Sequence, residues 1–164
     1  MQHLVGCKLP DVELIRTRGG AINPARLSST CVYFCYPYTG RPNHPNPPGW
    51  DDIPGAHGST PQALAYSELA DEFARRNVQV FGVSFQSTEW QTEFAVRSYL
   101  KIPLLSDQAK EFSTELALPT FNAGPEAFLT RITLLAQQGA ITAVRFPVAE
   151  PECDAIEILE LLTS

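Results

Sequence analysis

A single small polar residue, Ser59, lies where three segments of the chain could together build a reactive site. The proline-rich stretch 37–58 precedes it, a strand-like run ends just before that stretch, and a segment with helical spacing follows it. The hydroxyl of Ser59 could act as a nucleophile if a base such as His57 lay beside it. It could equally cap the helix that follows, because serine is a preferred N-cap residue.

The residues around Ser59 do not favour hydrolase chemistry. A nucleophile elbow has the pattern G-x-S-x-G, whereas Ser59 is followed by Thr60 and Pro61. Ser59 and His57 are two residues apart, a spacing that rarely gives the geometry of a nucleophile and its base. From these residues alone we expect Ser59 or Thr60 to cap a helix, with Pro61 early in it, where its missing N–H costs nothing.

Four polar side chains of the loop 37–58 could be imagined around a metal ion. They are His44, Asp51, Asp52 and His57. Their spacing matches no familiar zinc or calcium pattern. We therefore interpret them as solvated loop residues and expect neither a metal nor a cofactor.

The four cysteines give no disulfide framework and no C-x-x-C pair. Cys31 and Cys35 lie on one predicted strand, about 13 Å apart, which is too far for a disulfide. We expect both to pack in the core as small apolar residues. Cys7 lies in the N-terminal segment, and Cys153 lies at the start of the last predicted helix.

Length, composition and charge place limits on the class of protein. A chain of 164 residues with a net charge of -6 is long enough for one domain with a full core. The acidic balance argues against nucleic acid or an anionic membrane as a partner. No apolar run approaches the ~20 residues that span a bilayer. The N-terminus lacks the features of a signal peptide, so we expect a cytoplasmic protein.

Two apolar runs and the helix between them position Ser59. Residues 30–36 are apolar and rich in strand formers, which indicates a strand buried on both faces. The loop 37–58 holds six prolines and four glycines, which exclude regular structure. A helix is expected from Ser59 to about Asn77, and a second buried strand over 78–84. Strand, helix and strand form a right-handed βαβ unit with high probability.

The remaining segments complete the order of a thioredoxin-like α/β fold, with a central mixed sheet flanked by helices. We expect Ile156, Leu159 and Leu162 of the last helix to face inward, and we find no domain break. The expected elements are a short strand at 12–15, a helical turn at 23–27, a helix over 87–100, an extended piece at 102–107, a short helix over 108–116, strands at 130–136 and 140–146 around a turn at 137–139, and a helix over 152–163.

Three of these segments resemble the peroxiredoxin family, which comprises thiol peroxidases with a thioredoxin fold. Residues 34–37 are similar to the family strand that ends in a Tyr-Pro-type turn. Residues 102–107 resemble its PLLSD segment, and residues 131–141 resemble its R-x-T-F-L-I-D-x-x-G-x-I strand and hairpin. The three lie in the family's order and spacing. They are most similar to the bacterioferritin-comigratory branch.

The resemblance implies an active site around Ser59. The turn at Gly58 and Ser59 looks like the family's G-C-T-P turn with serine at the peroxide-attacking cysteine, and Arg131 matches the family arginine. The family's proline and threonine are best matched by Pro37 and Thr39, with the rest of the loop inserted before Ser59. Without the resemblance, Arg131 reads as an exposed strand residue paired with a carboxylate.

The resemblance also implies a resolving cysteine in some members of the family. In the related branch it can lie five residues after the attacking cysteine, where this chain has Leu64. Cys153 is the remaining candidate for a resolving cysteine. If neither position serves, an external thiol has to reduce the enzyme.

The function that the resemblance implies is reduction of hydrogen peroxide or alkyl hydroperoxides. The partners would be a peroxide and a thioredoxin- or glutathione-like reductant, with a homodimer among the expected assemblies. A serine hydroxyl is not ionised near neutral pH, so the chain should be inactive at Ser59. Ser59 is either an engineered replacement of cysteine or the natural residue. The alternative function is a non-catalytic thioredoxin-fold module that binds or senses a ligand through the loop 37–58.

Overall fold

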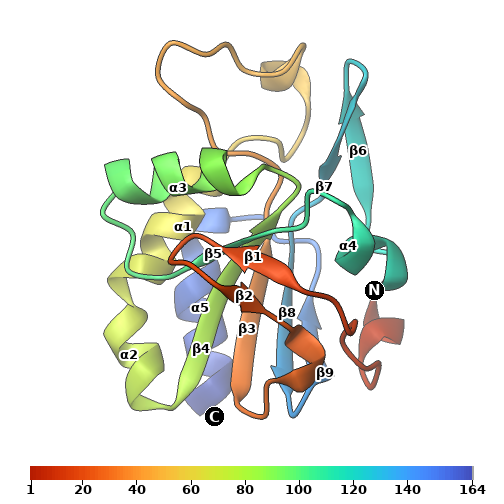
Figure 1. Cartoon of the computed structure of the whole chain (residues 1–164), viewed down its shortest axis with the longest axis vertical. Coiled ribbons are helices and arrows are strands. Elements are labelled where there is room, and N and C mark those ends of the chain that lie inside the picture. Colours follow the sequence, from red (N-terminus) through yellow and green to blue (C-terminus); the bar gives the residue numbers. More distant parts are fainter. Residues whose placement is uncertain (164) are drawn as a thin grey trace.

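A mixed sheet of seven strands runs through the centre of the protein, in the order β2-β1-β5-β4-β3-β8-β9. The computed structural model describes residues 1–163. Figure 1 shows helices on both sides of this sheet and the loop 37–58 projecting beyond its upper end. The arrangement confirms the predicted α/β class with a central mixed sheet.

The elements fall in the predicted order, with some additions. The strands are β1 (Leu14–Arg16), β2 (Ala21–Ile22), β3 (Thr30–Cys35), β4 (Val78–Ser84), β5 (Leu104–Ser106), β6 (Thr120–Ala123), β7 (Glu126–Leu129), β8 (Ile132–Gln137) and β9 (Ala140–Arg145). The helices are α1 (Ser59–Glu68), α2 (Ala70–Arg75), α3 (Thr88–Arg97), α4 (Glu111–Glu115) and α5 (Pro151–Thr163), with 3-10 turns η1 (Gln2–Leu4), η2 (Pro24–Arg26) and η3 (Trp50–Asp52).

The central strand β3 is buried on both faces, as its continuous apolar run predicts. It pairs in parallel with β4 and antiparallel with β8. Side chains alternate along a strand, so Val32 and Phe34 pack with the helices α1, α2, α3 and α5. Cys31 and Cys35 face the opposite cluster, which includes residues of α4 and of the N-terminal segment. Their predicted place in the core is confirmed.

Two helix predictions need correction. The helix expected from Ser59 to Asn77 is interrupted at Leu69, which separates α1 from α2. In α5, Ile156 is 43% exposed, so its predicted inward orientation is wrong. The inward face is instead set by Ala155, Ile158 and the fully buried Asp154. Because a polar residue lies on the core side of this helix, the spacing of its apolar residues alone predicts the wrong buried face.

The sequence did not reveal the hairpin of β6 and β7. These strands form a separate two-stranded sheet with four antiparallel residue pairs. The hairpin packs against the loop 37–58 through Trp50, which is 4% exposed and contacts the rings of Phe121 and Phe128. Through these contacts Trp50 anchors the loop 37–58 to the rest of the protein.

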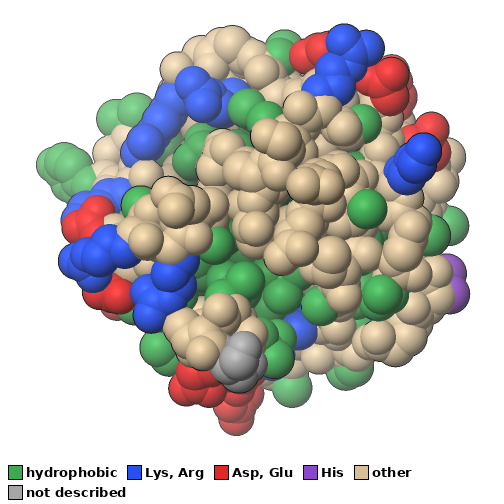
Figure 2. Space-filling model, turned by 90° about the horizontal axis from the view of Figure 1, so that it is seen from below, with side chains coloured by type: hydrophobic (Ala, Val, Ile, Leu, Met, Phe, Trp, Pro, Cys, Tyr) green, Lys and Arg blue, Asp and Glu red, His purple; other side chains and the backbone are tan. Residues whose placement is uncertain are grey.

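The face at the end of the sheet opposite the loop carries mixed charge. Figure 2 shows Lys and Arg side chains around the rim of this face, several of them beside Asp or Glu. Near the end of α2, Glu72 accepts hydrogen bonds from Arg75 and from Arg76, which follows the helix. Among residues 1–163, no helix has the length and apolar content needed to cross a bilayer.

Candidate active site

Ser59 is the first residue of α1, and the residue that caps this helix is Gly58. Gly58 has a φ of 116° and provides no side chain for capping, so the expected capping by Ser59 or Thr60 is wrong. A Cβ atom on Gly58 would lie 2.7 Å from Cγ of Pro151, at the start of α5. Glycine is therefore required both by the backbone angle and by the close approach of α5. The Ser59 side chain is left free to contact another element.

That contact comes from Arg131, which lies between β7 and β8. Its Nη1 donates to Ser59 Oγ at 3.3 Å and to Gln62 Oε1 at 2.6 Å. Its Nη2 donates to the carbonyl oxygens of His57 at 3.1 Å and Gly55 at 3.4 Å. Arg131 is 5% exposed, which excludes the reading of an exposed strand residue. Four acceptors fix the guanidinium group against the first turn of α1.

The guanidinium of Arg131 stays charged at neutral pH despite its burial. Burial lowers the pKa of Arg131 to about 10, and the carboxylates of Asp154 and Glu152 oppose that shift. A positive charge at the N-terminus of α1 adds to the helix dipole, which also favours negative charge there. The surroundings of Ser59 are therefore arranged to stabilise an anion.

Gln62 connects this site to a buried carboxylate that was not expected from the sequence. Gln62 is fully buried one helical turn after Ser59, and its Nε2 donates to Asp154 Oδ2 at 3.1 Å. The same oxygen accepts from Tyr66 Oη and from Thr133 Oγ1, each at 2.7 Å. Gln62 and Tyr66 could have been noticed as polar groups on the buried face of α1. No pattern pointed to Asp154.

The other oxygen of Asp154 faces Arg145 of β9. Arg145 Nε and Asp154 Oδ1 lie 3.3 Å apart, as an ion pair rather than an aligned hydrogen bond. Arg145 also pairs with Glu157 of α5. Burial, followed by the charge of Asp154, raises the pKa of the Tyr66 hydroxyl well above its usual value. Tyr66 is therefore a permanent donor to the carboxylate.

Thr39 is buried, but its hydrogen bonds serve other partners. Its backbone N and its Oγ1 donate to Oε1 of Gln86 at 3.1 and 3.2 Å. Its carbonyl oxygen accepts from Gln86 Nε2 at 3.1 Å and from Trp90 Nε1 at 2.7 Å. Within residues 1–163, no hydrogen bond joins Thr39 to Ser59 or Arg131. The predicted peroxide contact of Thr39 therefore stays a prediction.

A cavity of about 260 Å³ opens beside Ser59. Tyr38, Asn46 and Trp50 line it together with residues 56–61, so the loop 37–58 forms most of its wall. His57 turns away, since its Nε2 lies 2.7 Å from Asp51 Oδ1. The residues described in the structure therefore contain no serine–histidine pair at this site. Pro37, expected here, lines a different cavity instead.

Cys153 lies on α5, two residues after the Pro151 that approaches Gly58. It is partly exposed. Burial raises the pKa of its thiol, and the carboxylates of Glu150 and Glu152 raise it further. These surroundings disfavour a thiolate. A resolving role for Cys153 remains a prediction.

The fold and the site together define a thioredoxin-fold protein with a buried arginine at a helix N-terminus. Solved structures share the fold. Peroxidoxin BcpB from Mycobacterium tuberculosis has a TM-score of 0.77 at 21% identity, covering 97% of this chain and 96% of its own. A Cys-to-Ser mutant of PrxQ from Xylella fastidiosa has a TM-score of 0.78 at 19% identity, covering 97% of this chain and 94% of its own. The bacterioferritin comigratory protein of Xanthomonas campestris has a TM-score of 0.75 at 21% identity, covering 95% of each chain.

The sequence itself shows the family. Residues 54–142, more than half of the chain, match the AhpC/TSA family. Peroxiredoxin Q of the chloroplast of Sedum lineare is 30% identical over 118 residues, which make up 70% of this chain and 59% of that relative. The chain belongs to the AhpC/TSA family of peroxiredoxins, as the resemblance predicted. It spans 59% of the length of the Sedum relative.

Proposed function

We propose that this chain carries a peroxiredoxin-type peroxide site whose attacking position is held by Ser59, so that peroxidase turnover is silent in the chain as it stands. The observation that carries the proposal is the contact of 3.3 Å between Arg131 Nη1 and Ser59 Oγ at the first residue of α1. A cysteine at this position would have a guanidinium and a helix dipole beside its sulfur. Both favour the thiolate.

The chemistry of such a thiolate is a displacement at the peroxide. The sulfur attacks one peroxide oxygen, an S–O bond forms, and the O–O bond breaks. The leaving oxygen departs as hydroxide or alkoxide and takes up a proton, while the sulfur becomes a sulfenic acid. Arg131 would stabilise the negative charge that develops on the leaving oxygen. A neutral serine hydroxyl can neither start this step nor store the oxidation.

The substrate class proposed is hydrogen peroxide and small alkyl hydroperoxides. The bacterioferritin comigratory protein of Xanthomonas campestris has alkyl peroxide reduction activity. The cavity beside Ser59, at about 260 Å³, has room for a small organic group. Leu64 stands five residues after Ser59, so a reactivated site would depend on an external thioredoxin- or glutathione-like thiol.

Peroxide consumption in the presence of a thiol reductant tests the proposal. The parent chain should be inactive, and Ser59→Cys should consume peroxide. Thr60→Cys is the matched control, because it places an exposed cysteine one residue later, without the contact to Arg131. Cys7 and Cys153 are present in all three proteins, so their background reaction cancels. An inert Ser59→Cys whose thiol pKa is not lowered would overturn the proposal, as would equal activity in Thr60→Cys.

The second candidate function is a non-catalytic binding module, and one observation favours it. The loop 37–58 walls a second, larger cavity of about 650 Å³ that does not include Ser59 or Arg131 among its lining residues. A site of this kind does not require a thiol. The parent chain would then bind a ligand in its present form, with Ser59 unchanged.

A further inference from the structure

The larger cavity lies between three elements that are distant in sequence. The loop 37–58, the junction of β4 with α3, and the β6–β7 hairpin each contribute part of its wall. It shares only Tyr38 with the residues that line the cavity beside Ser59. At about 650 Å³ it falls within the ~300–1,000 Å³ range of small-molecule sites.

Four aromatic side chains and five prolines are among the residues that line the cavity, and two hydrogen bonds hold Trp90 in place. Tyr38 lies 5.8 Å from the ring of Trp90 and 6.0 Å from the ring of Phe128. Trp90 Nε1 donates to the carbonyl of Thr39, and the backbone N of Trp90 donates to Ser87 Oγ at the start of α3. The hydrogen bonds of Thr39 thus fix the wall of this cavity. A pocket whose rings are already held loses little entropy when it binds a flat ligand.

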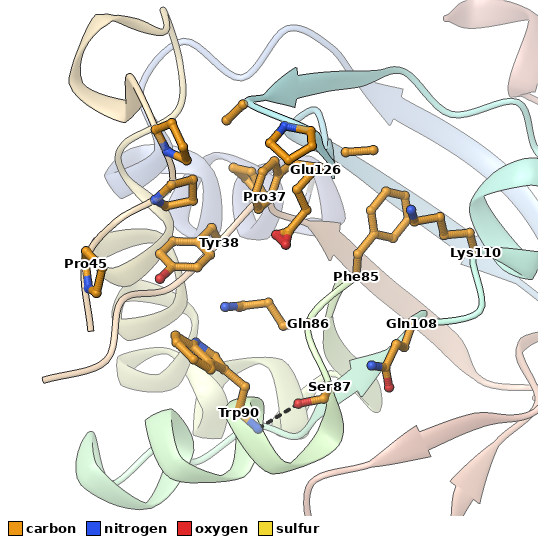
Figure 3. A pocket seen from close by; sticks show the side chains of 16 residues that line it. Pro37, Tyr38, Pro45, Phe85, Gln86, Ser87, Trp90, Gln108, Lys110 and Glu126 are labelled. Carbon is orange, nitrogen blue, oxygen red and sulfur yellow. Dashed lines mark hydrogen bonds between the residues drawn. The ribbon is translucent and has the colours of Figure 1, made fainter. Parts of the chain in front are cut away.

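Glu126 is among the residues that line this largely apolar cavity, and its side chain is exposed to solvent. Figure 3 shows its carboxylate pointing toward Tyr38 and Gln86. Within residues 1–163, Glu126 forms no ion pair or side-chain hydrogen bond. This charge also acts on Tyr38: burial raises the pKa of the Tyr38 hydroxyl, and the negative charge of Glu126 raises it further.

The basic residue of the cavity does not neutralise Glu126. The ammonium of Lys110 lies 5.1 Å from the centre of the Phe85 ring, as a cation–π contact. In Figure 3 the Lys110 side chain lies on the side of Phe85 away from Glu126. A free carboxylate beside the faces of aromatic rings is the arrangement that attracts an organic cation.

We propose that this cavity binds a small organic amine, with a flat apolar body against Tyr38 and Trp90 and its ammonium group on Glu126. The inference goes beyond the peroxide site and uses the chain with Ser59 unchanged. Binding should be the same in the parent chain and in Ser59→Cys. A failure of the peroxidase test therefore leaves this proposal intact, and the reverse also holds.

Calorimetric titration with three related aromatic probes tests which polar group the cavity prefers. The probes are phenethylamine, phenethyl alcohol and 3-phenylpropionate, which share a phenylethyl group and differ in the polar end, at constant ionic strength. We expect the amine to bind more tightly than the other two. Equal or tighter binding of the alcohol or of the carboxylate would overturn the proposal. So would the absence of any heat of binding for the amine up to about 10 mM, because a weaker affinity is below that of a specific site.

Two charge variants within the cavity locate the binding energy. Glu126→Gln should weaken amine binding about tenfold, the size expected for a partly exposed ion pair beside aromatic rings. Lys110→Gln should leave amine binding unchanged or tighter. The opposite pattern contradicts the proposal. Circular dichroism verifies that both variants fold, which is expected because both side chains are exposed.

A second copy of the chain could cover the cavity instead of an amine. In that case sedimentation will show a dimer and the amine will not bind, and this result also overturns the proposal.

Discussion

At the scale of single residues, the site is an anion-stabilising environment without its anion. Arg131 is buried and charged, and it faces the first residue of α1. In the proposed peroxide site, an oxygen at Ser59 stands where a peroxidase would carry a sulfur, so the ionisable group is missing while Arg131 is present. The chemistry therefore depends on one atom, and the surrounding geometry determines whether restoring a sulfur restores the reaction.

The first prediction concerns the charge of Arg131. In the Ser59→Cys background, Arg131→Gln should raise the pKa of the Cys thiol, because the guanidinium no longer stabilises the thiolate. The rate with peroxide at neutral pH should fall about 10²-fold or more, the loss typical of one missing charge-stabilising donor. The thiolate fraction, and part of the rate, should return as the pH rises through the raised pKa. Thiolate absorbance and peroxide kinetics across pH measure both effects.

Arg41→Gln is the control for that experiment, since it removes a charge of the same sign from an arginine of the loop. Arg41 pairs with Glu89 and stacks on Trp90, with no contact to Ser59. Arg41→Gln should leave the pKa of the thiol introduced by Ser59→Cys unchanged. An equal pKa change in both variants would mean that net charge, and not the contact at Ser59, controls the thiol.

A second prediction concerns Cys153. Burial and the carboxylates of Glu150 and Glu152 raise the pKa of its thiol, so little thiolate is present at neutral pH. Iodoacetamide should alkylate Cys153 more slowly than a cysteine in an unstructured peptide, and the rate should rise with pH. Glu150→Gln should accelerate the reaction. Rapid alkylation at neutral pH would contradict the prediction and would support a resolving role for this cysteine.

At the scale of elements, Asp154 joins the parts that carry the site. It lies on α5 and accepts hydrogen bonds from α1, through Gln62 and Tyr66, and from β8, through Thr133. Gln62 in turn holds Arg131. The position of the guanidinium is therefore determined by packing between two helices and a strand, and not by the segment that carries it.

The third prediction follows from this connection. Asp154→Ala should destabilise the protein by about 3–5 kcal/mol, because it leaves buried donors and the guanidinium of Arg145 without their acceptor. Asp154→Asn should cost less, since an amide oxygen still accepts. Urea denaturation measures both. Asp52→Ala, at an exposed position of η3, serves as the control, and a comparable loss there would contradict the assignment.

At the scale of the whole molecule, the sheet and the upper end that bears the two cavities differ in how they are held. β3, β4 and β8 are paired on both sides or buried between two layers. The β6–β7 hairpin is a separate two-stranded sheet, packed against the loop 37–58 by a small aromatic cluster. The loop 37–58 and the β6–β7 hairpin are thus joined to the main sheet by a smaller set of packed residues than those that hold the central strands together.

The fourth prediction applies to that difference. Amide hydrogen exchange should be slowest in β3 and β4, where opening requires global unfolding, and faster in β6 and β7, which can open locally. Mass spectrometry of exchanged peptides measures both regions in one experiment. Phenethylamine should slow exchange in β7 and in the loop 37–58 without changing β3. Equal protection of the hairpin and the central strands would contradict this division.

The central strands of the sheet and the family could be predicted from the sequence alone. The continuous apolar run 30–36 and the segment from Arg131 to Ile141 needed no tertiary knowledge, because each pattern is local and its physical cause is burial. The pairing of Ser59 with Arg131 was predicted from the resemblance. In the structure, Arg131 Nη1 and Ser59 Oγ lie 3.3 Å apart.

The contacts between elements distant in the sequence became visible only in the folded structure. It gave Asp154 its three donors, turned the hydrogen bonds of Thr39 toward Gln86 and Trp90, and left Glu126 unpaired in an aromatic cavity. These arrangements bring together side chains that lie tens of residues apart, on elements whose relative placement is set by core packing. A local pattern carries no information about such contacts, since a polar residue on an apolar face reads the same whether its partner is water or a buried carboxylate.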